Sequence, residues 1–383
     1  MRIAIAGAGK MAAGLIHDFL HHDPPEKILL LDQSGEALAA LRARFPAAPL
    51  EVVRCDLGSP VEVAAAIGGY DGLIGAATYR LNAVLAEVAI EKGLSMVDLG
   101  GNPDIVARQL ALDEKARRRG VTILPDCGLA PGLVSVLAAD GIRQVGEADS
   151  VRMRVGGLPV DPQPPLKYAI SFSAEGLVNE YLEDAEVLRD GRPVTVPSLS
   201  ELETIEFPPP YGRLEAFQTA GGSSTLPRTY AGKVRELDYK TIRYPGHCEI
   251  LRTLFALGFA GADPVETRVG KAVPKEVLIT LLDRALPHDQ EDVILLRVTT
   301  TGTGGERVIH EWITPFDSQT GLSAMQQCTA FPAAIAMQLI LAGRRTRAGV
   351  VPQEDALDPR EVLEGLARRG LPVEIRQEAP DRA

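Results

Sequence analysis

The sequence is poor in features that mark several large classes of protein. Its four cysteines lie far apart and form no Cys-x-x-Cys pair, which argues against a zinc site or a disulfide framework. No basic run is longer than Arg117–Arg119, and a net charge of −11 argues against a surface that neutralises nucleic-acid phosphates. No uninterrupted apolar stretch reaches the roughly 20 residues that a membrane-spanning helix needs. We therefore expect neither nucleic acid nor a membrane among the partners.

The chain also begins without a charged leader followed by an apolar segment, so we expect a cytoplasmic protein. Its 383 residues exceed the usual ceiling for one hydrophobic core, which predicts two domains. A composition of 45% hydrophobic and 24% charged residues is ordinary for a chain that folds throughout.

A glycine-rich turn follows the first predicted strand, residues 2–6. The sequence GAGKMA (7–12) has Gly-x-Gly-x-x-Ala spacing and leads into a helical apolar pattern, which is typical of dinucleotide binding. Its first glycine permits the tight turn, its second lets the backbone approach a pyrophosphate, and the helix start presents free N–H groups. Glycine-rich turns also simply connect strands to helices, so the motif alone is weak. The expected cofactor contacts here are Gly7, Gly9, Lys10 and Met11.

A second predicted strand, residues 28–31, ends in Asp32, roughly twenty residues after Gly9. An acid at this place can accept hydrogen bonds from the ribose hydroxyls of adenosine. Gln33 and Ser34 offer no arginine for a 2′-phosphate, so NAD is favoured over NADP. Alternatively, Asp32 caps a helix expected at 34–45.

Four more apolar runs, 50–54, 72–77, 95–100 and 121–126, alternate with segments of helical length. This alternation predicts an α/β fold with a Rossmann-type parallel sheet, in which ligands bind beyond the carboxyl ends of the strands. Residues at those ends are candidates, although they also suit simple turns. The candidate cofactor residues at the strand ends are Asp56, Ala76, Ala77, Thr78, Asp98, Gly100 and Asp126.

The breaker-rich segment PDCGLAPG (125–132) marks the predicted domain boundary. We expect an NAD-binding domain over 1–130, a substrate-binding and dimerisation domain over 131–330, and C-terminal helices over 331–383. The elements expected beyond the boundary are a helix at 132–146, a strand at 150–157, a helix at 174–185, a hairpin of 292–301 with 306–316, a helix at 330–342, and helical, peripheral structure in the final forty residues.

Four motifs carry a resemblance to a known family. PDCGLAPG (125–132), VGGLPVDPQPPLKYAISFSAEGLVNEY (155–181), LEAFQTAGGSSTLPR (214–228) and KTIRYPGH (240–247) resemble the saccharopine dehydrogenase family, most closely its lysine 6-dehydrogenase branch. The resemblance implies a Rossmann domain, a second α/β domain with a mixed sheet, a homodimer, and a late helix that returns to the first domain. It also implies nicotinamide-dependent oxidation at a carbon–nitrogen bond.

The favoured function is oxidative deamination of L-lysine at its ε-carbon by NAD, giving ammonia and a semialdehyde that cyclises. One alternative is a dehydrogenase acting on saccharopine, which has three carboxylates. Counting the available cations, Lys167, Arg213, Arg228, Lys240 and Arg243, leaves both substrates open. Another alternative is a non-catalytic NAD-binding sensor.

Two residues are predicted to be catalytic. Asp126 could act as base or position the substrate ammonium, or it could cap the following helix. His247 has an ordinary pKa suited to proton transfer, or it caps or braces a helix over 247–258. Arg243, at the end of a strand, could clamp a carboxylate with two parallel hydrogen bonds. Lys240 and Glu249 could pair on the surface. The remaining predicted substrate residues are Tyr168, Glu175 and Thr225.

Overall fold

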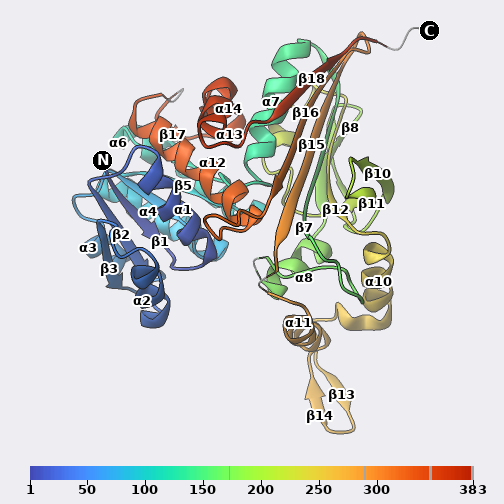
Figure 1. The fold of residues 1–383 in the computed structure, drawn as a ribbon, viewed down its shortest axis with the longest axis horizontal. Coiled ribbons are helices and arrows are strands. Elements are labelled where there is room, and N and C mark those ends of the chain that lie inside the picture. Colours follow the sequence, from blue (N-terminus) through green and yellow to red (C-terminus); the bar gives the residue numbers. More distant parts are fainter. Residues whose placement is uncertain (172, 289, 345–346, 381–383) are drawn as a thin grey trace. The chain divides into compact units, whose positions relative to one another are not determined.

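The computed structural model describes residues 1–380 except 172, 289, 345 and 346. The described chain divides into two compact units, coloured by sequence in Figure 1. The first comprises Met1–Gln144, Ser224–Leu226 and Gln326–Val373, and the second comprises Val145–Ser223, Pro227–Met325 and Glu374–Ala383. The first unit therefore runs past the 125–132 segment, and it takes back a long C-terminal stretch.

The first unit is built on a seven-stranded parallel sheet, which confirms the predicted Rossmann-type architecture. Its order is β17-β6-β5-β4-β1-β2-β3, so the chain reverses direction across the sheet between β1 and β4. Such a reversal is where doubly wound sheets bind nucleotides. The strands are β1 (Arg2–Ala6), β2 (Lys27–Asp32), β3 (Leu50–Arg54), β4 (Gly72–Gly75), β5 (Ser95–Asp98), β6 (Thr122–Leu124) and β17 (Gly349–Val350).

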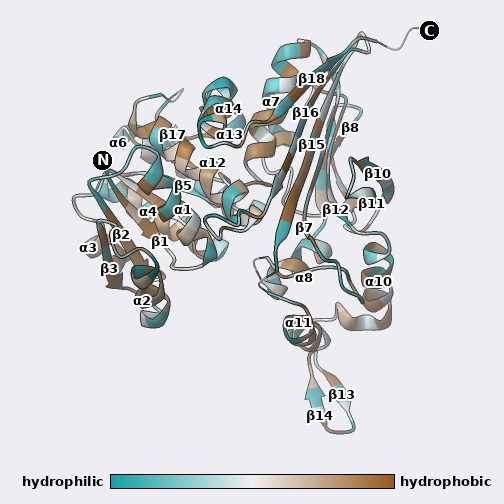
Figure 2. Cartoon of the chain, in the orientation of Figure 1, coloured by the Kyte–Doolittle hydropathy of each residue, from teal (hydrophilic) through white to brown (hydrophobic). Residues whose placement is uncertain are grey.

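The strands are apolar because the sheet is buried, as the brown ILLL run of β2 shows in Figure 2. The helices of this unit begin and end at the signals that the sequence provides, such as Ser34 capping α2 and Gly93 ending α4. They are α1 (Lys10–His21), α2 (Gly35–Arg44), α3 (Pro60–Ala66), the short 3-10 turn Tyr79–Leu81, α4 (Asn82–Lys92), α5 (Pro103–Leu110), α6 (Asp113–Arg119), α7 (Leu133–Val145), α12 (Ala324–Leu341), α13 (Gln353–Ala356) and α14 (Pro359–Arg368).

Helix α12 is long and apolar enough to cross a membrane by length and composition, the one such helix in the described residues. In the structure 72% of it is buried. It packs closely in the first unit, since a side chain on Gly14 would lie 2.8 Å from the Cβ of Ala330, and one on Gly72 would lie 2.5 Å from the sulfur of Met337. Its apolar character is that of a core helix.

The second unit contains a mixed nine-stranded sheet in which β7 pairs in parallel with β12 and antiparallel with β15. This confirms a second α/β domain with a mixed sheet, and the pairing of β15 with β16 confirms the predicted hairpin. Its strands are β7 (Ala148–Pro159), β8 (Ala185–Arg189), β9 (Arg192–Val196), β10 (Glu203–Phe207), β11 (Gly212–Gln218), β12 (Glu236–Arg243), β15 (Asp292–Gly302), β16 (Arg307–Pro315) and β18 (Glu374–Glu378).

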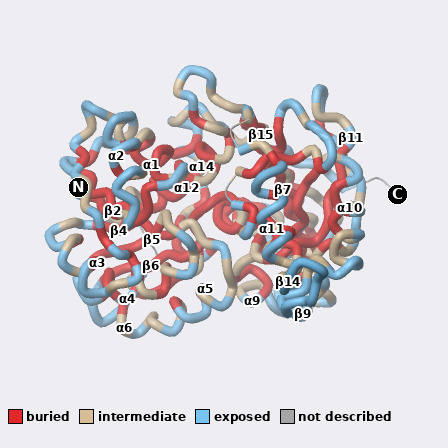
Figure 3. The backbone as a smooth tube through the Cα atoms, turned by 90° about the horizontal axis from the view of Figure 1, so that it is seen from below, coloured by how far each residue is buried: buried red, intermediate tan, exposed pale blue. Residues whose placement is uncertain are grey.

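The helices of this unit cover a second core centred on residues such as Leu177, Phe217 and Leu251. They are α8 (Ala174–Leu182), α9 (Leu226–Thr229), α10 (His247–Leu254) with a π-turn at Phe255–Phe259, and α11 (Pro274–Ala285). A separate hairpin of β13 (Val265–Thr267) and β14 (Gly270–Ala272) precedes α11, and β14 stands out as exposed in Figure 3.

The prediction that the final forty residues are helical and peripheral is wrong in part. β17 extends the first sheet beside β6, and Val350, Val351 and Ala356 are buried. β18 pairs with β16 at the edge of the second sheet. Its sequence, EIRQE, is exposed at every position and so lacks the apolar alternation by which a strand is recognised.

Candidate active site

The glycine-rich turn has the geometry of a phosphate cradle. Gly7 has a φ of +113°, and a side chain there would lie 2.6 Å from the carbonyl oxygen of Ala76, so the fold itself requires a glycine. A side chain on Gly9 would meet nothing within 4 Å. Gly9 precedes α1, whose start carries no side-chain cap. The open space and the uncapped helix start fit a pyrophosphate approaching the backbone.

Asp32 lies beside this turn at the end of β2. Its carboxylate accepts hydrogen bonds from the N–H of Ala8 at 2.7 Å and from the N–H of Ser34 at 2.8 Å. Ser34, and not Asp32, caps α2, because its hydroxyl accepts from the N–H of Ala37. The capping alternative for Asp32 is therefore wrong, and its place next to the glycine-rich turn suits ribose recognition.

The other strand ends differ in how accessible they are. Asp56 and Thr78 are exposed, and Ala76 and Ala77 are half-buried, which leaves room for a flat ligand. Asp98 is fully buried, and its carboxylate accepts from the N–H groups of Gly100 and Asp126 and from the amide of Gln109. Burial raises the pKa of Asp98. Asp98 thus orders the loops at this edge instead of offering a free carboxylate to a ligand.

Asp126 follows β6 with a φ of +60°, an uncommon backbone for a residue other than glycine. The residue is 5% exposed, and its carboxylate accepts a hydrogen bond from the hydroxyl of Ser224. A side chain on Gly100 would lie 2.2 Å from its Oδ1, so glycine is needed at position 100. Burial, together with the charges of Asp98 and Glu354, raises the pKa of Asp126 to about 8, against the effect of Ser224. A carboxyl group with this pKa can exchange a proton near neutral pH.

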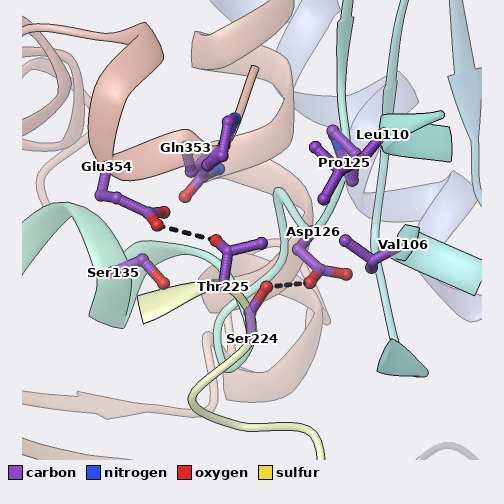
Figure 4. A pocket seen from close by; sticks show the side chains of 10 residues that line it. Val106, Leu110, Pro125, Asp126, Ser135, Ser224, Thr225, Gln353 and Glu354 are labelled. Atoms are coloured by element: carbon purple, nitrogen blue, oxygen red, sulfur yellow. Dashed lines mark hydrogen bonds between the residues drawn. The ribbon is translucent and has the colours of Figure 1, made fainter. Parts of the chain in front are cut away.

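Thr225 and Glu354 lie beside Asp126 (Figure 4). The hydroxyl of Thr225 donates to Oε1 of Glu354 at 2.7 Å, in a buried position. Ser224 and Thr225 are adjacent, so one short segment contacts both acids. Sequence reasoning selected Thr225 but missed Glu354, because α13 lies in the stretch that was expected to be peripheral.

Arg243 is the centre of a second polar cluster, in the second unit. It ends β12 as predicted and is 4% exposed. Its Nε donates to the hydroxyl of Tyr181 at 2.8 Å, and its guanidinium lies 4.9 Å from the ring centre of Tyr168. Glu180 is 4.0 Å from its Nη2. We call Arg243, Tyr181, Tyr168, Glu180 and His247 the Arg243 cluster.

His247 opens α10 directly after the Pro245-Gly246 turn, as predicted. Its Nδ1 lies 3.0 Å from the carbonyl oxygen of Leu166, which can only accept, so Nδ1 carries the proton. Its Nε2 therefore accepts from the hydroxyl of Tyr181, 3.0 Å away. Burial and the charge of Arg243 lower the pKa of His247 to about 3. A buried, neutral imidazole with both nitrogens engaged does not suit the predicted proton transfer and instead braces the cluster.

The remaining predictions have mixed outcomes. Tyr168 is buried against Arg243, whereas Glu175 is exposed in the first turn of α8. The surface pair of Lys240 and Glu249 is wrong. Lys240 is buried and binds Glu203 at 2.8 Å, while Glu249 lies 3.7 Å from Arg252. Sequence reasoning missed Tyr181 and Glu180, although both belong to the motif 155–181 and lie on the α8 pattern.

Two family models match almost the whole chain. Residues 3–124 match the saccharopine dehydrogenase NADP binding domain, and residues 128–371 match the saccharopine dehydrogenase C-terminal domain. The chain belongs to the saccharopine dehydrogenase family. The family resemblance of the four motifs is thereby confirmed, and the first unit is a nicotinamide-dinucleotide-binding domain within a family of oxidoreductases.

Curated relatives are similar at low identity. Saccharopine dehydrogenase (NADP+, L-glutamate-forming) of Pyricularia oryzae is 22% identical over 250 residues, covering 63% of this chain and 55% of the relative. The mitochondrial alpha-aminoadipic semialdehyde synthase of Mus musculus is 23% identical over 334 residues, covering 82% of this chain and 34% of the relative. The chain thus spans about half of the fungal relative and a third of the mouse relative. Neither name specifies lysine 6-dehydrogenase, so that branch stays a prediction.

Two solved structures share the fold. Apo saccharopine dehydrogenase (L-Glu forming) from Saccharomyces cerevisiae has a TM-score of 0.80 at 17% identity, covering 99% of this chain and 100% of that one. Homospermidine synthase from Legionella pneumophila in complex with NAD has a TM-score of 0.71 at 12% identity, covering 100% and 92%. At such identities the likeness shows the fold alone.

Proposed function

We propose that the protein is an NAD-dependent dehydrogenase that deaminates L-lysine at its ε-carbon. The product is a 6-semialdehyde that cyclises onto its own α-amine, with release of ammonia. Support for an amino-acid substrate comes from family membership, and support for lysine comes from the number of cations left to bind carboxylates.

The number of cations left to bind the carboxylates of a substrate is the observation that carries the proposal. Of the five candidate cations, Arg243 combines burial with aromatic neighbours and a carboxylate no closer than 4.0 Å. Lys240 is bound to Glu203, and Arg228 faces Glu186 at 3.3 Å. One well-placed arginine matches the single carboxylate of lysine better than the three of saccharopine. The other two candidates contact neutral oxygens, Lys167 that of Pro245 and Arg213 that of Thr204, but neither is buried as Arg243 is.

Arg243 would hold the α-carboxylate through its Nη2. Tyr181 and His247 fix its Nε side, and the carbonyl oxygen of Ile242 accepts from Nη1. The Tyr181 hydroxyl accepts from Arg243 and donates to His247, so its orientation is determined. A guanidinium held in this way loses little rotamer freedom when a ligand binds, which favours affinity.

Asp126 would act as the base. Lysine must lose a proton from its ε-ammonium, whose ordinary pKa is about 10.4, before its ε-carbon can release a hydride. The raised pKa of Asp126, about 8, narrows the gap between base and ammonium. A bound nicotinamide would supply the hydride acceptor. Asp126 could afterwards take a proton from the water that attacks the iminium.

We propose NAD as the preferred cofactor because Asp32 lies where the ribose hydroxyls are bound and would repel a 2′-phosphate. Arg54, whose Nε donates to the carbonyl oxygen of Gln33 at 3.0 Å, is the nearby cation that favours NADP as the alternative. The NADP-dependent fungal relative gives that alternative weight. A homodimer and a cytoplasmic location complete the proposal; light scattering and fractionation of the source cells test them.

Oxidation of saccharopine is the second candidate, since the relatives bear that name. One assay separates the possibilities: the absorbance of reduced cofactor is followed with lysine and saccharopine offered separately, each with NAD+ and NADP+. We expect the highest kcat/KM with lysine and NAD+. Faster turnover of saccharopine would overturn the substrate assignment, and no turnover of any amine would favour a non-catalytic NAD-binding sensor.

A further inference from the structure

A small cavity lies beside Asp126 in the first unit (Figure 4). The volume that the centre of a water-sized molecule can occupy in this cavity is about 10 Å³, close to the volume that a single water needs. Apolar side chains, among them Val106 and Leu110, form part of the wall. The polar part of the wall consists of Asp126, Ser135, Ser224, Thr225, Gln353 and Glu354.

Two hydroxyls of the cavity wall are already engaged as donors, whereas two buried oxygens of its residues are not satisfied. Ser224 already donates to Asp126, and Thr225 already donates to Glu354. Gln353 is a buried residue whose side chain is hydrogen-bonded to Cys127. Its Oε1 nevertheless has no hydrogen-bond partner. Oδ1 of Asp126 also makes no hydrogen bond of normal geometry. The backbone of Gly101 lowers the pKa of Asp126, but this is the smallest of the named effects on that pKa. Buried acceptors of this kind call for a donor.

The charges around the cavity are negative. The ionisable neighbours that act most on Asp126 are Asp98, from β5, and Glu354, from α13, and both are acids. Cys127, the next residue along the loop, is a buried thiol whose pKa is raised well above its ordinary value, so it stays neutral. A ligand here must therefore be small, must donate hydrogen bonds, and gains from a positive charge.

We propose that this cavity is a binding site for a free ammonium ion. Ammonium is about the size of a water molecule. It has four N–H donors and a positive charge, whereas water has two O–H donors and no net charge. The inference rests on the proposed function, in which water attacks the iminium and the carbon–nitrogen bond breaks. The iminium and the water molecule together become an aldehyde and one ammonium ion. The site would take up that ion beside the base that had served the reaction.

Binding should be linked to the protonation of Asp126, because a proton and an ammonium ion compete for the same carboxylate. Burial, together with the charges of Asp98 and Glu354, raises the pKa of Asp126 to about 8, so the proton stays on this carboxyl group at neutral pH. Ammonium should therefore bind more tightly as the pH rises toward 8 and should release a proton as it binds.

Thermal unfolding of the full chain without cofactor or substrate tests the site. Ammonium chloride should raise the Tm relative to equal concentrations of potassium chloride, since K+ has a similar size but no N–H donors, and the rise should be larger at pH 8 than at pH 6.5. Methylammonium, with a second heavy atom, should have little effect. Equal shifts with potassium would overturn the hydrogen-bonding argument, and equal shifts with methylammonium would show a site for the substrate's amine instead.

Two neighbouring acids of α13 provide a matched pair of variants. Glu354→Gln should raise the apparent Kd for ammonium at least about tenfold, while Asp355→Asn, at an exposed position on the same helix, should leave it unchanged. An ammonium effect that survives Glu354→Gln intact would overturn the proposal. This measurement needs no turnover, so it separates the two proposals. Ammonium binding without lysine oxidation would refute the proposed function and keep the site. Lysine oxidation without ammonium binding would refute the site alone.

Discussion

The Nε of Arg243 donates a hydrogen bond to the hydroxyl of Tyr181, and that hydroxyl contacts Nε2 of His247. The three side chains come from the end of β12, from α8 and from the start of α10. The direction of each hydrogen bond follows from the carbonyl of Leu166, which obliges His247 to carry its proton on Nδ1. On the other edge of the guanidinium, Nη1 donates to the carbonyl oxygen of Ile242 at 2.9 Å, and Nη2 lies 4.0 Å from Glu180.

Replacing Arg243 with lysine keeps the charge but loses the planar fork. We expect lysine oxidation to lose about 1.5 to 3 kcal/mol of transition-state binding, mostly as a higher KM for lysine, with KM for NAD+ little changed. The measurement is kcat/KM for lysine and for an amine without an α-carboxylate. The second substrate should be poor with both proteins. An equal loss on it, or a much lower Tm, would mean that Arg243 is a structural ion-pair partner.

His247→Gln tests whether the imidazole exchanges protons. Because the folded pKa of His247 is lowered to about 3, the unfolded chain binds more protons between that pH and about 6.5. The stability due to neutral His247 is thus present above pH 6.5 and is lost as the pH falls. The variant should show a weaker loss of stability on acidification and an unchanged pH profile of kcat. If the variant lost one of the pH-dependent limbs of the kcat profile, His247 would have to be a proton carrier after all.

Asp126→Asn removes the proposed base while keeping the shape of the side chain. The rate should fall by about 10²- to 10⁴-fold, the usual contribution of a general base, whereas the wild-type rate should rise with pH across the region of pH 8.

The same substitution has an opposite effect on stability. Since the folded pKa of Asp126 is raised to about 8, its stabilisation is complete below the unfolded pKa and is lost as the pH rises through 8. The variant should therefore gain stability relative to the wild type at alkaline pH, as denaturant unfolding at several pH values would measure. A variant that is as active as the wild type, or whose stability relative to the wild type falls above pH 8, contradicts the assignment of Asp126 as a base with a raised pKa.

Cofactor preference should depend on Asp32. Replacing it with serine, together with Gln33→Arg, removes the carboxylate and adds a cation for a 2′-phosphate, so preference should move toward NADP+. If the ratio of kcat/KM for the two cofactors stays within about threefold, well under the tenfold that 1.4 kcal/mol represents, the ribose assignment is wrong. Arg54→Gln is the companion variant, because loss of this nearby cation should lower activity with NADP+ more than with NAD+.

The features that the sequence predicted well are local. A turn needs its glycine within a few residues of the strand it ends. The Gly7 turn, the position of Asp32 at the end of β2, and the placement of Arg243 before the start of α10 could therefore be derived from short patterns. The family motifs likewise indicated a mixed second sheet, which is present.

The decisive contacts of the site join residues far apart in the chain, and only the tertiary structure could decide them. Ser224 reaches Asp126 across 98 positions, and Thr225 reaches Glu354 across 129. Burial likewise settles protonation, since the same imidazole that would titrate near neutrality in water is held neutral at His247, and the same carboxyl is held protonated at Asp126. Residue type sets the ordinary pKa, but desolvation and neighbouring charge depend on which distant segments the fold brings together.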